Sequence, residues 1–213
     1  MFSGPLNASI IRRALIAQKV QIEYYNLREF SDDRYKSVDD HPYGGGTGMV
    51  LRVDVIDRAL KHIRSVTPIS KTTVILLDPQ GVPYTQKIAR DLTANEHIIL
   101  ICGHYEGVDE RVRSLVDREI SIGDYVLTGG EIPAMVLVDS VVRLIPGVLA
   151  KSNATEHESF EGGVLEYPQY TRPEEYNGST VPPVLKSGNH AQIAAWQKEQ
   201  AIIKTKKRRP DLI

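Results

Sequence analysis

The chain of 213 residues is long enough for one sizeable hydrophobic core, or for one core and a small second unit. Its contents of 41% hydrophobic and 25% charged residues are ordinary for a globular protein, and no apolar run approaches the roughly 20 residues that cross a bilayer. The formal net charge of −1 excludes strong overall basicity, but the charge is uneven, with a basic run over residues 204–209.

The N-terminal part predicts a helix, a strand and a long loop. Residues 4–18 have apolar positions at helical spacing, and we expect Asn7 to cap that helix. Residues 20–25 alternate between apolar and polar side chains, which predicts a strand. Residues 26–49 are polar, with four glycines between positions 44 and 48, so they predict a loop. Two interpretations of this loop stay open: a flexible connector, or a functional loop that acts as a mobile lid or contacts phosphate.

Three strand–loop–helix units follow a helix predicted over residues 53–63. Continuous apolar runs predict the three strands, at residues 72–77, 97–102 and 120–122. Each strand is followed by a turn that contains glycine, at residues 78–81, 103–107 and 123–130. Helices are expected after these turns, over residues 85–93, 108–116 and 131–144. Buried strands that alternate with helices predict an α/β fold with a parallel sheet.

The three glycine-containing turns are the candidate ligand site. The carboxyl ends of parallel strands lie at one edge of a sheet, where ligands bind. After the third turn, Glu131 and Pro133 are typical of the first turn of a helix, whose N-terminus suits a small polar ligand. None of the turns has the Gly-x-Gly-x-x-Gly pattern or the Gly-Lys-Ser/Thr of a P-loop. The sequence therefore argues against a dinucleotide-dependent oxidoreductase and against a nucleoside triphosphatase.

The composition changes after the third unit. We expect a first domain over residues 1–150, a polar linker over 151–165 and a small C-terminal domain over 166–213. The C-terminal domain predicts a helix over residues 191–203, and it is too short for a large core of its own. We expect it to pack on something else, such as a second subunit.

Seven stretches of the chain carry a family resemblance, at residues 38–46, 79–81, 102–111, 121–133, 143–149, 167–173 and 185–190. Together they closely resemble the bacterial tRNA (guanine-N1)-methyltransferases, the knotted SPOUT branch of the S-adenosylmethionine-dependent enzymes. The resemblance implies an α/β fold whose parallel sheet is closed by a deep C-terminal trefoil knot, with a small helical C-terminal domain that binds tRNA. It also implies a homodimer with the cofactor near the interface. The implied reaction is methylation of N1 of the guanine immediately 3′ of the anticodon.

The resemblance places S-adenosylmethionine in the three turns. The residues implied to contact it are Leu77, Pro79, Gln80, Gly81, Gly103, Tyr105, Glu106, Gly107, Ile122, Gly123, Asp124, Tyr125, Val126, Leu127, Gly129, Gly130 and Pro133. Leu127 and Pro133 would form apolar walls, and Glu106 would face the positive sulfonium or amino group. The alternative for any one residue is that the glycines only close turns and the tyrosines belong to the core. No ligand spacing indicates a metal site, and Mg²⁺ is suggested by the resemblance alone.

Guanine N1 carries a proton, so its methylation needs a general base and a donor to the charge that develops on O6. In the family the base is an aspartate in an Asp-Ser-Phe stretch, and this chain has Glu-Ser-Phe at residues 158–160. Glu158 is therefore the candidate base, with His157 and Glu156 as neighbouring alternatives. Arg143 matches the arginine that assists near O6, and a salt bridge at a helix end is its alternative role.

Two other departures from the family concern Asp78 and the chain ends. Asp78 stands where relatives often have serine or cysteine, and it adds charge beside the first turn. Relatives begin with about ten more residues, which form a first strand, and they often continue further at the C-terminus. Without that strand we expect an exposed sheet edge or a weaker core.

Contacts to RNA phosphates are expected from basic side chains, namely Arg12, Arg13, Arg172, Lys186 and residues 204–209, which include Lys206, Lys207 and Arg208. Ser187, Asn189 and His190 are candidates to bond base or sugar edges, with helix capping as the alternative for Asn189. The target base would be flipped out of its stack into the site.

Two other functions stay open: a knotted methyltransferase that acts on another RNA, and a catalytically impaired protein that binds RNA or the cofactor. The single cysteine, Cys102, excludes an internal disulfide and a cysteine metal cluster. No secretory leader is visible at Met1, so we expect a cytoplasmic protein with no membrane partner.

Overall fold

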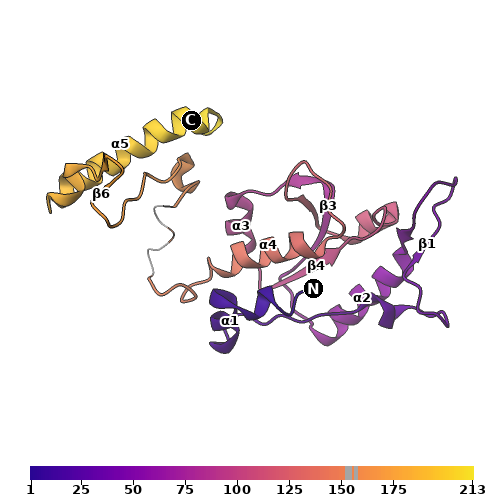
Figure 1. Cartoon of the computed structure of the whole chain (residues 1–213). Coiled ribbons are helices and arrows are strands. Elements are labelled where there is room, and N and C mark those ends of the chain that lie inside the picture. The colour runs from indigo at the N-terminus through magenta and orange to yellow at the C-terminus, as the bar shows by residue number, and fades with distance from the viewer. Residues whose placement is uncertain (152–154, 156–157) are drawn as a thin grey trace. The chain divides into compact units, whose positions relative to one another are not determined.

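The computed structural model describes residues 1–151, 155 and 158–213, and they form two compact units, Met1–Leu149 and Ala150–Ile213. Figure 1 labels the helices α1 to α5 and the strands β1, β3, β4 and β6. None of the helices in these described residues is long and apolar enough to cross a membrane.

The first unit is built on a three-stranded sheet with the strand order β4-β3-β5. The central strand, β3 (Thr72–Pro83), pairs in parallel with both β4 (His97–Cys102) and β5 (Arg118–Ser121). The apolar side chains from Val74 to Leu77 are buried because helices cover both faces of this sheet. The mixed α/β fold with a parallel sheet is confirmed, and the trefoil knot stays a prediction.

The predicted turn at residues 78–81 lies inside β3. Leu77 and Val82 both pair with Ile120, and the register shifts between them. The four residues between Leu77 and Val82 therefore leave the ladder as a bulge, and the strand resumes beyond them.

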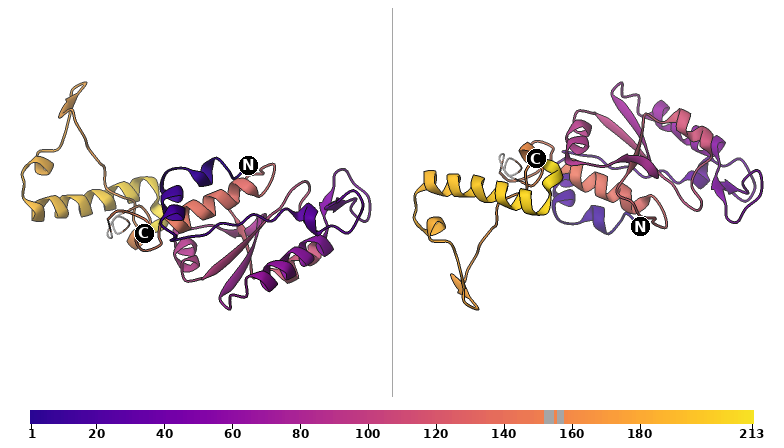
Figure 2. Two further views of the ribbon diagram at one scale, coloured as in Figure 1. Left: turned by 90° about the horizontal axis from the view of Figure 1, so that it is seen from below. Right: turned by 90° about the horizontal axis from the view of Figure 1, so that it is seen from above.

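Helices cover the two faces of the sheet, as Figure 2 shows. On one face α2 (Val53–Val66) packs against the buried side chains of Val74 and Leu76. The opposite face is covered by α3 (Gln86–Leu92) and α4 (Glu131–Val142).

Alternate residues of β3 point to opposite faces, so Ile75 and Leu77 belong to this second core cluster. Thr85 caps α3 by accepting a hydrogen bond from the Ile88 N–H.

The predicted N-terminal helix is shorter than expected. A 3₁₀ turn, η1 (Pro5–Asn7), precedes α1 (Ser9–Ile16), which packs against α4. The prediction that Asn7 caps the helix is wrong, because Ala8 occupies the cap position and the Asn7 side chain donates to the Ser3 carbonyl at 2.9 Å.

The strand predicted at residues 20–25 is also wrong, because this segment pairs with no strand of the described chain. Its residues instead line a cavity of about 1330 Å³ whose other walls include α4 and β4, which is an edge strand of the sheet. An alternating pattern becomes a strand only when another strand satisfies its backbone groups.

The predicted loop over residues 26–49 contains some regular structure. It includes a 3₁₀ helix, η2 (Leu27–Phe30), and β1 (Asp39–Asp40), which pairs antiparallel with β2 (Val50–Leu51). The glycine stretch between these strands is a loop, as predicted. Its four glycines all have positive φ, a conformation that other residues rarely adopt.

The helix predicted over residues 108–116 is a 3₁₀ helix, η3 (Glu110–Leu115). Asp109 caps it by accepting a hydrogen bond from the Arg111 N–H at 2.9 Å, so the segment begins as the sequence suggests but does not form α-helical turns.

The second unit contains one long helix, α5 (His190–Arg208), which extends beyond the predicted residues 191–203. Shorter elements complete it: η4 (Glu161–Gly163), the hairpin of β6 (Glu175–Tyr176) and β7 (Ser179–Thr180), η5 (Pro183–Lys186) and η6 (Pro210–Leu212). Thr205 of α5 is fully buried and accepts a hydrogen bond from the Leu165 N–H at 2.8 Å. This bond ties the segment before the hairpin to the helix.

Candidate functional site

The ends of the three parallel strands meet at one edge of the sheet. Leu77 pairs with Cys102 on one side and with Ile120 on the other. The turns that follow these residues, which we name loop 1 (residues 78–81), loop 2 (residues 103–107) and loop 3 (residues 122–130), therefore begin close together. We call their combined edge the rim.

Loops 2 and 3 are in direct contact. The backbone N–H of Gly130 donates to the Gly103 carbonyl at 2.8 Å, and His104 forms an antiparallel bridge with Gly129. Loop 2 also lies against the end of β3, because a Cβ on Gly103 would be 3.5 Å from the Leu77 carbonyl oxygen, an ordinary van der Waals distance. At Gly130 a Cβ would lie only 2.8 Å from the Gly103 backbone nitrogen, so glycine there lets loop 3 pack against loop 2.

Loop 1 packs against β5. A Cβ on Gly81 would lie 2.5 Å from the carbonyl carbon of Glu119 and 2.5 Å from the nitrogen of Ile120. Such a distance is too short for any side chain, so only glycine fits at this point of the bulge. All three loops are therefore held to adjacent strand ends.

The glycine stretch at residues 44–48 leads directly into contacts with loop 2. The Glu106 N–H donates to the Met49 carbonyl at 3.1 Å, and the Leu51 N–H donates to the Gly107 carbonyl at 3.0 Å. A Cβ on Gly48 would lie 2.5 Å from the Glu106 side chain. These contacts place the glycine stretch beside loop 2, one of the predicted cofactor loops. A lid over the cofactor would have to lie at this position.

The two tyrosines of the rim are surface residues in this chain. Tyr105 is 49% exposed and Tyr125 is 55% exposed, so the alternative that they belong to the core is wrong. The Tyr105 ring packs edge-on against the His104 ring, with centroids 4.6 Å apart. The Tyr125 hydroxyl donates to the Ile122 carbonyl at 3.3 Å, which folds its ring over Gly123.

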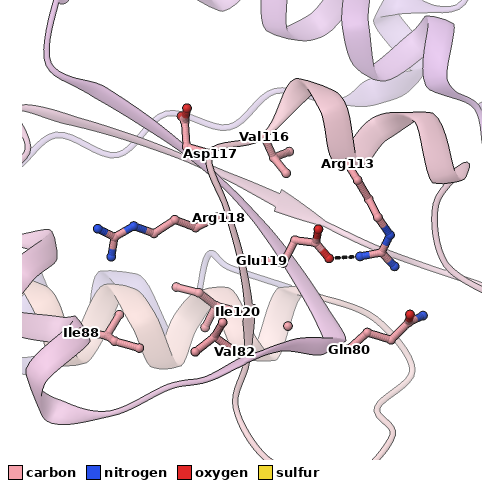
Figure 3. A pocket seen from close by; sticks show the side chains of 10 residues that line it. Gln80, Val82, Ile88, Arg113, Val116, Asp117, Arg118, Glu119 and Ile120 are labelled. Atoms are coloured by element: carbon pink, nitrogen blue, oxygen red, sulfur yellow. Dashed lines mark ion pairs between the residues drawn. The ribbon is translucent and has the colours of Figure 1, made fainter.

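Two cavities border the rim. A cavity of about 550 Å³ lies beside loop 1, and Figure 3 shows the side chains that line it. Of the residues predicted to contact the cofactor, Gln80 and Gly81 line this cavity, and Tyr105 lines the larger cavity beside β4. Residues 124–128 of loop 3 are exposed and line neither cavity.

Cys102 lies at the end of β4, where loop 2 begins. Burial, and then the nearby Glu131 carboxylate, raise the pKa of its thiol to about 12. The thiol is therefore protonated at neutral pH, which makes Cys102 a poor nucleophile.

The two predicted catalytic residues belong to different units. Arg143 follows the last turn of α4 in the first unit and is half-buried, and its backbone N–H donates to the Asp139 carbonyl at 3.3 Å. Glu158 is half-buried in the second unit. The alternative bases, Glu156 and His157, lie outside the described residues.

The predicted RNA-contacting residues of the second unit are mostly exposed. His190 stands at the start of α5, and Lys206, Lys207 and Arg208 form its last turn. Arg172 and Ser187 are exposed as well.

The capping role of Asn189 is confirmed, since its Oδ1 accepts a hydrogen bond from the Gln192 N–H at 3.2 Å. Two of the predicted phosphate contacts have other partners: Lys186 forms an ion pair with Glu174, and the Lys204 ammonium donates to the Glu166 carbonyl at 2.8 Å. In the first unit, Arg12 and Arg13 are exposed on α1.

Within the described residues, no group of three or more histidine, cysteine, aspartate or glutamate side chains is arranged to hold a metal ion.

Comparison with known proteins decides the family. All of residues 1–213 match the family described as tRNA (Guanine-1)-methyltransferase TrmD. The chain belongs to this family. A relative from Dictyoglomus turgidum, named tRNA (guanine-N(1)-)-methyltransferase, is 53% identical over 213 residues, which are 100% of this chain and 85% of that protein.

Proteins of the same name from Desulforudis audaxviator and Staphylococcus aureus are 55% and 53% identical, over 100% of this chain and 85% and 86% of their own lengths. The resemblance of the seven sequence stretches to the tRNA (guanine-N1)-methyltransferases is thereby confirmed, and membership of a methyltransferase family implies use of S-adenosylmethionine.

Proposed function

We propose that the chain transfers a methyl group from S-adenosylmethionine to N1 of the guanine immediately 3′ of the anticodon in tRNA. The observation that carries this proposal is the rim: the family's cofactor stretches fall on three loops that the parallel sheet brings to one edge. The activity named for the relatives is the activity that this arrangement supports best.

The rim fits the proposed cofactor chemically. S-adenosylmethionine supplies the electrophilic methyl group when it is bound. Leu127, which is 36% exposed, offers an apolar surface, and the Glu106 carboxylate suits a positive sulfonium or amino group. The role of the loops is to hold the cofactor in one orientation, because misplacement of a reacting group by about 1 Å costs roughly 10²-fold in rate.

Glu158 is the proposed general base, which takes the proton from guanine N1. Glutamate and aspartate have similar intrinsic pKa values, so a glutamate can serve where the family has an aspartate. Arg143 is proposed to donate to guanine O6, since its planar guanidinium suits the negative charge that develops there.

The second unit is proposed to bind tRNA. The exposed cations in the last turn of α5 suit phosphate contacts, and Arg172 adds another. Because the Asn189 Oδ1 caps α5, its contact with RNA is assigned to the amide NH₂ group. Ser187 and His190 are proposed to bond base or sugar edges beside it.

A homodimer is part of the proposal, because apolar side chains beside the rim are exposed. Val126 of loop 3 is 85% exposed, and Ile132 and Val136 of α4 are 43% and 41% exposed. A second copy on this surface would cover these side chains and enclose loop 3. Sedimentation equilibrium should give twice the mass of one chain, and a stable monomer would exclude this part of the proposal.

We propose that Mg²⁺, which the family suggests, is held largely by the bound substrates, since Mg²⁺ keeps several waters and rarely uses an all-protein cage. Chelation with EDTA should then lower turnover without changing the stability of the protein. The single free thiol and a tRNA substrate are both consistent with the cytoplasm.

Methyl transfer to tRNA transcripts tests the proposed function. Labelled S-adenosylmethionine is supplied with a transcript that has guanine 3′ of the anticodon and with a matched transcript that has adenine there. Transfer to the guanine transcript alone is the expected result. Equal transfer to both would indicate another target, and cofactor binding without transfer would indicate an impaired enzyme.

A further inference from the structure

Arg113 of η3 connects loop 1 to the strand that leads into loop 3. Its Nη2 lies 3.7 Å from the Asp78 Oδ2 of loop 1, and its Nη1 pairs with the Glu119 carboxylate of β5. Its Nε also donates to the Glu110 carboxylate of its own turn at 2.8 Å. Figure 3 shows Arg113 directed toward Glu119 at the wall of the cavity beside loop 1.

The contacts with Asp78 and Glu119 are partly shielded from water. The Asp78 side chain is 10% exposed, Arg113 is 20% exposed and Glu119 is 27% exposed, whereas Glu110 is 83% exposed. The Coulomb attraction within such a pair is stronger than in an exposed pair, and removal of the Arg113 cation leaves the shielded carboxylates of Asp78 and Glu119 without this partner.

Asp78 also shapes loop 1. Its Oδ1 accepts a hydrogen bond from the Gln80 N–H at 2.8 Å, which closes the turn, while its other oxygen faces Arg113. Gly81, one residue further on, packs directly against the Glu119–Ile120 backbone. The same guanidinium therefore contacts loop 1 and the strand on which loop 1 rests.

We propose that Arg113 is a positioning residue for the cofactor, acting through Asp78 and Glu119 to fix the bulge that presents Gln80 and Gly81 at the rim. This inference rests on the proposed function, because it assumes that S-adenosylmethionine binds at the rim. Arg113 itself need not touch the cofactor or the guanine.

The test is a double-mutant cycle with Arg113→Met, Asp78→Asn and the combined variant, with S-adenosylmethionine affinity measured by calorimetry. Arg113→Met should raise the Kd for the cofactor about tenfold, and the KM for the cofactor in proportion. The kcat at saturating cofactor and the KM for tRNA should stay within about twofold, since only the cofactor loop is displaced. The rise in the Kd of the combined variant should be smaller than the product of the two single rises, because both substitutions break the same contact.

Arg111→Met is the matched control, because Arg111 also lies in η3, is 70% exposed, pairs with Asp109 and lines neither cavity of the rim. It should leave the Kd unchanged. Circular dichroism and thermal unfolding check that each variant is folded. If Arg113→Met does not fold, Arg113→Lys replaces it, because lysine keeps the charge but not the planar fork.

Four results would overturn the inference. Folded Arg113 variants with the Kd of the unaltered protein would show that the ion pairs do not position the loop. A fall in kcat together with an equal rise in the KM for tRNA would show general damage instead. An unaltered protein that does not bind S-adenosylmethionine would contradict the proposed function as well. Unchanged methylation rates of all the variants at cofactor concentrations below the KM would contradict only the positioning role.

Discussion

Gly130 lies so close to Cys102 that a Cβ on Gly130 would be 2.6 Å from the Cys102 Cα. Loop 3 therefore rests on the backbone at the end of β4 with no room for a side chain between them. This approach allows the Gly130 N–H to reach the Gly103 carbonyl and joins two of the three loops.

Gly130→Ala should lower the free energy of unfolding by about 1–3 kcal/mol, because backbone atoms cannot move aside as side chains can. Gly129→Ala is the control: its Cβ would approach the ends of the Glu131 and His104 side chains, which can turn away. Urea unfolding followed by circular dichroism compares the two. Equal costs at both positions would show that the backbone approach at Gly130 is unimportant.

Glu158→Ala should lower kcat by about 10²- to 10⁴-fold and leave the Kd for S-adenosylmethionine nearly unchanged, because a general base acts on the guanine and not on the cofactor. Glu158→Asp is the matched variant, since it keeps the carboxylate. Single-turnover methyl transfer, followed across a range of pH, compares the rates of the two variants. Undiminished turnover by Glu158→Ala would remove Glu158 from the mechanism.

Arg143→Ala should lower kcat by about 10²-fold without weakening cofactor binding, as expected when one donor to a developing oxyanion is lost. Arg143→Lys keeps the charge but loses the planar fork, so it should restore only part of the rate. The role near O6 would be wrong if Arg143→Ala lost cofactor affinity and rate together, because that pattern indicates a structural salt bridge.

Cys102 should react slowly with thiol reagents at pH 8 in the folded protein and quickly after unfolding in urea. The raised pKa of about 12 keeps the folded thiol protonated, whereas the unfolded thiol titrates near its ordinary value of 9.0. Between these values the unfolded chain binds fewer protons than the folded one, so stability should fall as pH rises from 9 toward 12. Rapid labelling of the folded protein at pH 8 would contradict the burial of this thiol.

Thr205→Val should destabilise the second unit by about 1–3 kcal/mol. The buried hydroxyl accepts from the Leu165 N–H and donates to the Ala201 carbonyl at 2.7 Å, and valine leaves that N–H without its partner. Trp196 is the single tryptophan and belongs to α5, so its fluorescence reports on the unfolding of this unit. Thr205→Ser keeps the hydroxyl and should cost less, and the opposite order would show that packing of the methyl group matters more.

The sequence predicted elements well where one local signal determined them. The apolar run at residues 97–102 coincides with β4, and the predicted turn at residues 78–81 leaves the ladder as a bulge. The prediction at residues 20–25 was wrong because a strand depends on a partner that the local pattern does not specify.

The predicted α-helix at residues 108–116 differs from the 3₁₀ helix for a related reason, since helix type depends on tertiary packing as well as on spacing. The sequence also predicted which loops meet at the rim, because parallel strands impose that arrangement. It could not predict the contact between Arg113 and Asp78, because the two residues are distant in the chain. An ion pair of this kind has no spacing signal, although the unusual aspartate at position 78 drew attention to the place.

A crystal structure of the chain with bound S-adenosylmethionine tests the central claim most directly. The account predicts cofactor density bounded by loops 1, 2 and 3, with Gln80 and Gly81 on one side and Gly103–Gly130 contacts preserved on the other. Cofactor bound elsewhere on the chain, with the rim left empty, would contradict it.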